Sequence, residues 1–237
     1  MQVVSWILSQ IVRLSPHANM AKITRGRNLK DFNSQQASAD VGKLRIIGGK
    51  FRGRQIEYSG DPVTRPMKDI TREACFNLVG GYVDGKAVFD LFAGTGAIGL
   101  EALSRGASQA VLIERHVPTI RIVESNVQTL ELDSQAKVVT SDTFFWVRQF
   151  LNDPASWPQE PWAVFCCPPY VLFEDNRDDL LITMHSMVDV APEGSMFIVE
   201  SDHRFDTTDL PDSVQWQTRH YPPAYISVAH KTGLEPI

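Results

Sequence analysis

The spacing of apolar positions changes along the chain, and the changes predict alternating strands and helices. Residues 86–92 form a nearly continuous apolar run, which is typical of a strand buried on both faces of a parallel sheet. Residues 118–130 instead carry apolar side chains at helical spacing, with Ile120, Val123 and Val127 on one face. These two patterns predict further strands at 110–114, 137–141, 162–167 and 195–200, and further helices at 97–105, 143–151 and 178–190.

Two smaller β units flank this alternating region. Segments 44–47 and 55–58 lie on either side of a Gly-Gly pair, which predicts a hairpin. A helix is predicted to begin after it, near Pro66. Segments 214–220 and 225–230 predict a closing antiparallel pair. Alternating strands and helices that end in such a pair predict a doubly wound α/β sheet.

Length and composition fit one large domain. The chain has 237 residues, of which 43% are apolar, so its core needs no disulfide or metal. Its apolar runs are shorter than the roughly 18–20 residues of a membrane span, so we expect no membrane partner. The three cysteines, Cys75, Cys166 and Cys167, form no CxxC pair, which favours the reducing cytoplasm. The histidines show no metal-ligand spacing, so no metal is predicted.

Charge is distributed unevenly along the chain. The net charge is −5, yet residues 1–54 hold ten Lys and Arg against two Asp. A basic arm on an acidic body predicts a polyanionic partner on one side, although a solvated tail has the same composition. Residues 1–43 are polar and basic and are predicted to be a disordered extension, in which Met20 offers a second start. Residues 44–237 are predicted to be the domain, with the hairpin at 44–58 included.

A glycine-rich loop follows the first strand of the alternating region. Gly94, Gly96 and Gly99 form G-x-G-x-x-G between a strand and a helix, and Glu114 ends the next strand, 20 residues after Gly94. This carboxylate is placed to accept hydrogen bonds from two ribose hydroxyls. Asp90, just before the loop, would oppose the pyrophosphate of NAD but attract the sulfonium and ammonium of S-adenosylmethionine. The loop therefore favours S-adenosylmethionine over NAD.

Three more segments carry candidate chemistry. Asp142 ends the following strand and could accept from an adenine amine or cap the next helix. The sequence Cys167-Pro168-Pro169-Tyr170 lies at the carboxyl end of a strand, where two prolines fix the backbone and the ring can stack on a base, unless the segment is only a rigid turn. The predicted hairpin has basic residues around an aromatic, which suit phosphate contact and base stacking but also an ordinary solvated hairpin: Lys50, Phe51, Arg52 and Arg54.

From residue 44 to residue 230 the sequence resembles the RsmD-type ribosomal RNA guanine methyltransferases. The resemblance depends on LRIIGGKFRGR at 44–54, RPMKDITREACFNLV at 65–79 and FDLFAGTGAIGLEALSRGA at 89–107. It continues in LIE at 112–114, PPY at 168–170 and VES at 199–201. It implies a class I S-adenosylmethionine-dependent methyltransferase fold, with a seven-stranded, mostly parallel sheet. The implied partner is ribosomal RNA or an assembling small ribosomal subunit, and we expect a monomer.

The resemblance also implies roles for residues by position. Cofactor binding falls to Asp90, Gly94, Gly96, Glu114 and Asp142. The residues implied to contact RNA are Lys50, Arg52, Arg54, Arg65 and Arg72. Lys68 and Glu73 lie in the segment that borders the pocket in the family. Catalysis falls to Cys167, Pro168, Pro169 and Tyr170, which would hold a guanine flipped out of its stack.

Cys167 departs from the family pattern, which has Asp there, or Asn in related amine methyltransferases. A guanine amine is a poor nucleophile until acceptors orient its hydrogens, and a thiol accepts weakly. Cys167 therefore predicts reduced activity and leaves open a methyltransferase fold that only binds RNA. Three other functions are alternatives: a DNA adenine methyltransferase, an NAD-dependent oxidoreductase, and a cytosine methyltransferase with Cys167 as nucleophile.

Overall fold

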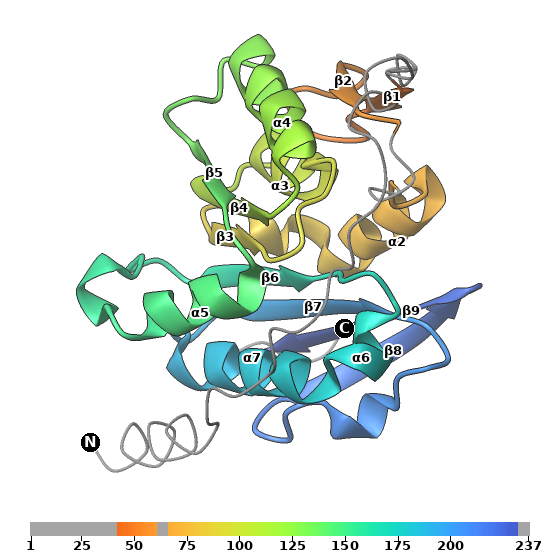
Figure 1. Ribbon diagram of the computed structural model, residues 1–237, viewed down its shortest axis with the longest axis vertical. Helices are drawn as coiled ribbons and strands as arrows, with labels where there is room; N and C mark the ends of the chain where they lie inside the picture. The colour runs from red at the N-terminus through yellow and green to blue at the C-terminus, as the bar shows by residue number, and fades with distance from the viewer. Residues whose placement is uncertain (1–41, 61–65, 232–237) are drawn as a thin grey trace, which may run out of the picture. The chain divides into compact units, whose positions relative to one another are not determined.

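Seven strands form the central sheet in the order β5-β4-β3-β6-β7-β9-β8 of the computed structural model, which describes residues 42–60 and 66–231 (Figure 1). Neighbouring strands pair in parallel from β5 to β7, and β9 pairs antiparallel with both β7 and β8. The mostly parallel sheet and its closing antiparallel pair confirm the predicted class. The strands are β3 (Ala87–Asp90), β4 (Gln109–Glu114), β5 (Ala136–Thr140), β6 (Trp162–Cys166), β7 (Met196–Ser201), β8 (Gln215–Tyr221) and β9 (Ala224–His230).

Helices cover both faces of the sheet, because its central strands are apolar on both sides. Along β3, Val88 packs with the helices of one face, whereas Ala87 and Phe89 pack with those of the other. The first face carries α2 (Asp69–Val79), α3 (Ala97–Ser104) and α4 (Val117–Thr129). The second carries α5 (Thr143–Leu151), α6 (Leu172–Asp175) and α7 (Arg177–Val190). The four-residue α6 was not predicted, since it is too short to show a period.

The carboxyl ends of the central parallel strands meet at one edge of the sheet. Asp90 at the end of β3 pairs with Leu112 of β4 on one side and with Phe165 of β6 on the other. The connection after β3 leads to β4 on one side, whereas the connection after the adjacent β6 leads to β7 on the other side, so the strand order reverses between β3 and β6. This switch point is where open α/β sheets bind their ligands.

The predicted hairpin is present as β1 (Gly42–Arg45) and β2 (Gln55–Tyr58). It is attached to α3, where Glu101 accepts hydrogen bonds from the amides of Ile47 and Gly48 at 2.7 Å each. Gly49 has a φ of +74°, and a Cβ there would lie 1.8 Å from the carbonyl oxygen of Ser104. Only glycine therefore allows this close approach of the hairpin to the end of α3.

The start of β1 corrects one predicted boundary. Gly42 and Lys43 belong to β1, although the sequence analysis placed both of them at the end of the disordered extension 1–43 and began the hairpin at residue 44. The rest of that extension lies outside the described residues. Within 42–60 and 66–231 no helix combines the length and apolar character needed to cross a bilayer.

Candidate active site

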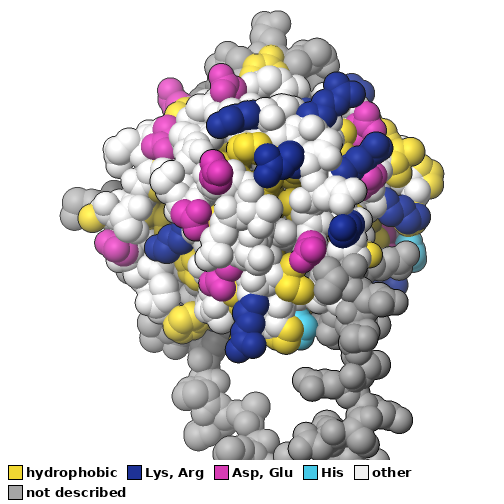
Figure 2. Space-filling view, turned by 90° about the horizontal axis from the view of Figure 1, so that it is seen from above, with side chains coloured by type: hydrophobic (Ala, Val, Ile, Leu, Met, Phe, Trp, Pro, Cys, Tyr) yellow, Lys and Arg dark blue, Asp and Glu magenta, His cyan; other side chains and the backbone are white. Residues whose placement is uncertain are grey.

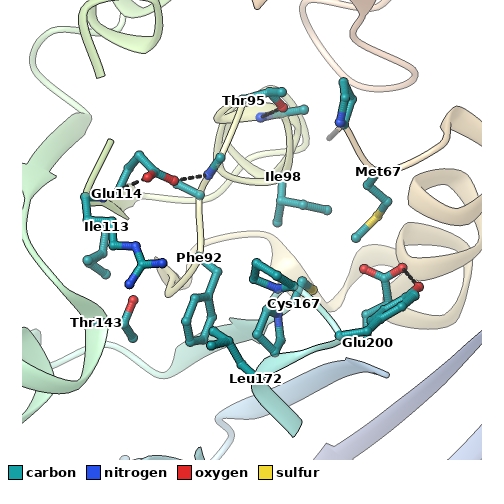
Figure 3. A pocket seen from close by; sticks show the side chains of 18 of the residues that line it. Met67, Phe92, Thr95, Ile98, Ile113, Glu114, Thr143, Cys167, Leu172 and Glu200 are labelled. Atoms are coloured by element: carbon teal, nitrogen blue, oxygen red, sulfur yellow. Dashed lines mark hydrogen bonds between the residues drawn. The ribbon is translucent and has the colours of Figure 1, made fainter. Parts of the chain in front are cut away.

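A cavity of about 550 Å³ opens at the switch point of the sheet. Its wall comes from the glycine loop after β3, the ends of β4 and β5, the turn after β6, and the end of β7. Figure 3 shows Glu114 and Thr143 on one side of it, and Met67, Cys167 and Glu200 on the other. Its volume is that of a site for a cofactor-sized ligand.

Glu114 and Gly94 lie together in the wall, as the sequence predicted. Oε2 of Glu114 accepts a hydrogen bond from the amide of Gly94 at 3.0 Å. Oε1 accepts from the amides of Arg115 and His116 at 2.8 and 2.7 Å. Backbone amides thus hold the carboxylate at the cavity, where Oε2 can still accept from a ligand hydroxyl, because it accepts only one of these three hydrogen bonds and has a second lone pair.

Asp90 and Gly96 are not part of the cavity wall, so the prediction that they contact the cofactor directly is corrected. Asp90 is 1% exposed and its Oδ2 accepts from the amide of Gly99 at 3.0 Å. Burial raises the pKa of Asp90 to about 7, although this hydrogen bond opposes the shift. Gly96 has a φ of +74°, and a Cβ there would lie 2.8 Å from Val123. Both residues stabilise the loop on the side that faces away from the cavity.

Asp142 lines the cavity and also caps a helix. Its Oδ1 accepts from the amide of Phe145 at 3.1 Å, at the start of α5. Its Oδ2 lies 3.9 Å from Nη1 of Arg115. The helix-cap interpretation is therefore confirmed, and the position at the cavity is compatible with an adenine contact.

The turn after β6 brings Cys167, Pro168, Pro169 and Tyr170 to the cavity together. Burial, with the charge of Glu200 nearby, raises the pKa of Cys167 well above its ordinary value. The thiol therefore stays protonated, which argues against a thiolate nucleophile. Cys166 points into the core on the opposite face, where burial raises its pKa to about 12.

Glu200 is a residue of the cavity that the sequence analysis did not select. It lies in β7, and its Oε1 accepts a hydrogen bond from the hydroxyl of Tyr170 at 2.7 Å. Its sequence signal is the acidic residue in VES, directly after the apolar run 196–199. Because β6 pairs with β7, that position lies beside Cys167.

The predicted RNA contacts divide into three groups. Lys50, Arg52 and Arg54 are exposed on the hairpin, and Figure 2 shows Lys and Arg side chains, with Asp and Glu among them, on the side of the molecule that it views. Arg65 lies outside the described residues. Arg72 is 1% exposed, so its assignment to the RNA surface is corrected.

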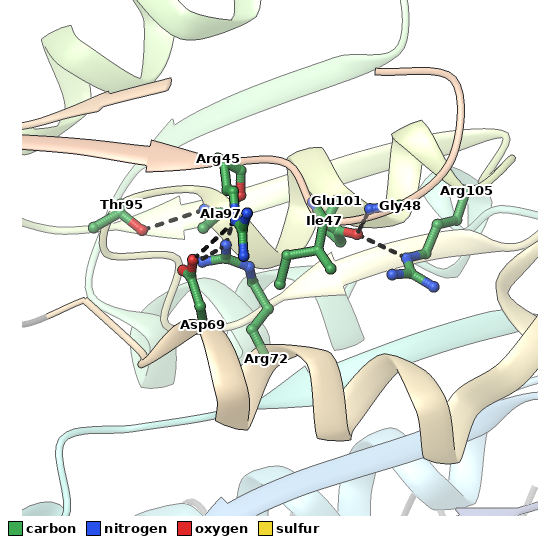
Figure 4. Close-up of polar contacts among 9 residues, drawn as sticks. All are labelled: Arg45, Ile47, Gly48, Asp69, Arg72, Thr95, Ala97, Glu101 and Arg105. Carbon is green, nitrogen blue, oxygen red and sulfur yellow. Dashed lines mark hydrogen bonds and ion pairs between the residues drawn. The ribbon is translucent and has the colours of Figure 1, made fainter. Parts of the chain in front are cut away.

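Arg72 instead joins α2 to the hairpin. Its Nη2 donates to the carbonyl of Arg45 at 2.7 Å and to Asp69 at 3.0 Å (Figure 4). Its Nε and Nη1 are buried without a hydrogen-bond partner. A buried guanidinium that holds two elements together cannot at the same time contact a phosphate on the surface.

The family described as conserved hypothetical protein 95 matches residues 44–222. A Bacillus subtilis protein named as a candidate rRNA methyltransferase, YlbH, is 32% identical over 72% of this chain and 88% of its own length. Ribosomal RNA small subunit methyltransferase D of Escherichia coli is 36% identical over 62% of this chain and 77% of its own length.

Solved structures have the same fold. A candidate methyltransferase of Escherichia coli, yhhF, has a TM-score of 0.65 at 29% identity, covering 81% of this chain and 100% of its own. The 16S rRNA N2 G1207 methyltransferase RsmC of Thermus thermophilus, solved with AdoMet and guanosine, has a TM-score of 0.60 at 19% identity, covering 81% of this chain and 50% of its own. At that identity the second likeness concerns the fold alone.

Proposed function

This chain belongs to the conserved hypothetical protein 95 family, that of the RsmD-type ribosomal RNA methyltransferases, and from that premise we propose that it methylates the exocyclic amine of a guanine in small-subunit ribosomal RNA. The methyl donor is S-adenosylmethionine, which supplies a methyl group on a sulfonium sulfur. One observation carries the proposal: a single cavity joins Glu114 and the glycine loop to the Pro-Pro-Tyr turn.

The loop side of the cavity fits this donor by its charge. Glu114 and Asp142 both line it, and the buried Asp90 lies behind the loop. These carboxylates suit a ligand that carries a sulfonium and an ammonium, and they would repel a pyrophosphate. Glu114 would accept from the ribose hydroxyls, Gly94 would let the ligand approach the backbone, and Asp142 would receive the adenine amine.

The other side of the cavity suits a flat base. Pro168 and Pro169 fix the backbone of the turn, and Tyr170 is held by its hydroxyl, so its ring is preset for stacking. A guanine must leave its stack or pair before its amine can reach the methyl group. The exposed Lys50, Arg52 and Arg54 of the hairpin would bind RNA phosphates outside the cavity.

The direct test uses labelled S-adenosylmethionine and small ribosomal subunits from a strain that lacks this gene. We expect label in the ribosomal RNA, at one guanine, with N2-methylguanine after digestion. A parallel reaction contains DNA in place of the subunits, and label on its adenine, with none in the ribosomal RNA, would support the alternative amine methyltransferase. Binding of RNA without transfer would support the alternative in which the fold only binds RNA, a function to which the weak acceptor Cys167 lends some support.

Replacing Glu114 with alanine should weaken S-adenosylmethionine binding by roughly 1.5–3 kcal/mol, the scale for loss of a charge-assisted hydrogen bond. The same change leaves the amides of Gly94, Arg115 and His116 without their acceptor, which loosens the loop. Isothermal titration calorimetry measures the effect, with exposed Glu124→Ala on α4 as the control. Tight NAD binding by the parent, with no binding of S-adenosylmethionine, would overturn the cofactor assignment.

Replacing Lys50, Arg52 and Arg54 with alanine should weaken RNA binding and flatten its dependence on salt. Each lost phosphate contact removes about 0.7–0.9 from the slope of log affinity against log salt. Affinity for S-adenosylmethionine should not change. The control removes the same charge from exposed sites elsewhere, with Arg148→Ala, Arg177→Ala and Arg219→Ala. An unchanged slope in the hairpin variant would mean that the hairpin has only a structural role.

A further inference from the structure

Glu200 occupies a special position in the sheet. Cys166 of β6 pairs with Val199 of β7, so Cys167 and Glu200 follow side by side on the two chains. Both line the cavity, and Figure 3 shows them on the same side of it, below Met67. Glu200 is only 8% exposed. A carboxylate is costly to bury, and this one lies beside the turn that would hold the base.

The two oxygens of Glu200 differ in their contacts. Oε1 accepts from the hydroxyl of Tyr170 at 2.7 Å. Oε2 makes no hydrogen bond to any residue in the described part of the chain. The tyrosine thus fixes the carboxylate by one oxygen and leaves the second available to a ligand in the cavity.

The other acidic residues of the cavity wall are placed elsewhere. Among the described residues that line it, Glu114, Asp142 and Glu200 are the acidic ones. Glu114 and Asp142 follow β4 and β5, on the side of the glycine loop. Among these three residues, Glu200 is therefore the one whose carboxylate lies beside the Pro-Pro-Tyr turn. The thiol of Cys167 also lies there, but a thiol is a weaker hydrogen-bond acceptor than a carboxylate.

We propose that Oε2 of Glu200 accepts a hydrogen of the target amine and takes up its proton as the methyl group is transferred; this inference rests on the proposed function. A bond forms between the amine nitrogen and the methyl carbon, and the carbon–sulfur bond breaks, with its electron pair staying on sulfur. The nitrogen then loses one proton to Oε2, and Glu200 passes it to solvent. Backbone carbonyls of the turn accept the second amine hydrogen.

The groups around Glu200 determine how the rate of methyl transfer depends on pH. Burial raises its pKa, and the hydrogen bond from Tyr170 opposes the shift. Ile226 is its apolar neighbour on β9. The titratable groups that interact with it electrostatically are Cys75 of α2, and Cys167 and Tyr170 of the turn after β6. Arg72 acts on Cys75, and Asp202, just after β7, acts on Tyr170. The acceptor is the ionised form, so the rate should fall as the pH is lowered through this raised pKa.

The test is Glu200→Gln, which keeps the size of the side chain and an oxygen for Tyr170. We expect the single-turnover rate on small ribosomal subunits to fall roughly 10²–10³-fold, the scale for one positioned electrostatic contact. The fall in rate at low pH should disappear, and the affinity for S-adenosylmethionine by calorimetry should not change. Glu193→Gln, an exposed site before the opposite end of β7, is the matched control.

A second variant separates catalysis from folding. Tyr170→Phe removes the hydrogen bond that lowers the pKa of Glu200, so the low-pH fall in rate should move to higher pH. Parental rate and pH profile in Glu200→Gln would overturn the inference. If Glu200→Gln does not bind S-adenosylmethionine, an unmoved profile in Tyr170→Phe overturns it instead. A parent that transfers no methyl group refutes the proposed function itself.

Discussion

Replacing Glu101 with alanine is expected to lower the free energy of unfolding by about 3–5 kcal/mol, because each hydrogen-bonding group that loses its buried partner costs roughly 1–3 kcal/mol. Glu101 is fully buried, and it accepts from Nε of Arg105 at 2.8 Å as well as from the amides of Ile47 and Gly48 (Figure 4). The alanine leaves two backbone donors and one guanidinium without their acceptor. Denaturant unfolding measures the loss.

Hydrogen exchange shows where that stability is lost. The amides of Ile47 and Gly48 should exchange faster in Glu101→Ala, because the carboxylate protects them in the parent. Exposed Glu124→Ala on α4 is the control and should change stability by less than about 0.5 kcal/mol. A Glu101→Ala protein as stable as the parent, with both amides still protected, would show that other contacts hold the hairpin.

Moving the carboxylate from position 200 to position 167 is expected to restore much of the activity that Glu200→Gln loses. In the double variant Cys167→Asp/Glu200→Gln, the new carboxylate would lie beside the old one, since the two positions are neighbours across β6 and β7. We expect the single-turnover rate to rise by roughly 10–10³-fold over Glu200→Gln alone, because a strong acceptor replaces a weak one.

The control for this exchange is Cys167→Ala/Glu200→Gln, which removes the thiol and adds no acceptor. Its rate should equal that of Glu200→Gln. Loss of all transfer in Cys167→Ala alone, with a covalent RNA adduct on the parent protein, would instead support a nucleophilic thiol. The raised pKa of Cys167 makes that outcome unexpected.

The sheet could be predicted because its signals are local. The apolar run before Asp90 and the glycines after it encode a buried strand and a tight turn, and the structure has both. Glu114 could be predicted as well, since a fixed spacing from Gly94 places it at the end of the adjacent parallel strand. Both predictions need only the order of the elements along the chain.

What could not be predicted depends on contacts between distant segments. Arg72 looks like a surface charge in sequence, but α2 turns it toward Arg45, 27 residues earlier. Asp90 looks like a ligand contact, but the turn directs it to Gly99 behind the loop. Glu200 becomes significant only when the register of β6 against β7 places it beside Cys167. No local sequence pattern encodes these contacts, because the residues that make them lie far apart along the chain.

Helix α3 is attached to the hairpin at one end and to the glycine loop at the other. Gly96 caps its first turn, and Glu101 and Ser104 near its other end hold the hairpin. Eight residues of helix span only about 12 Å, too short to bend appreciably. A displacement of the hairpin by bound RNA therefore also displaces the loop, because α3 moves as a rigid body. If this displacement changes the affinity for S-adenosylmethionine, thermodynamic reciprocity requires S-adenosylmethionine to change the affinity for RNA by the same factor.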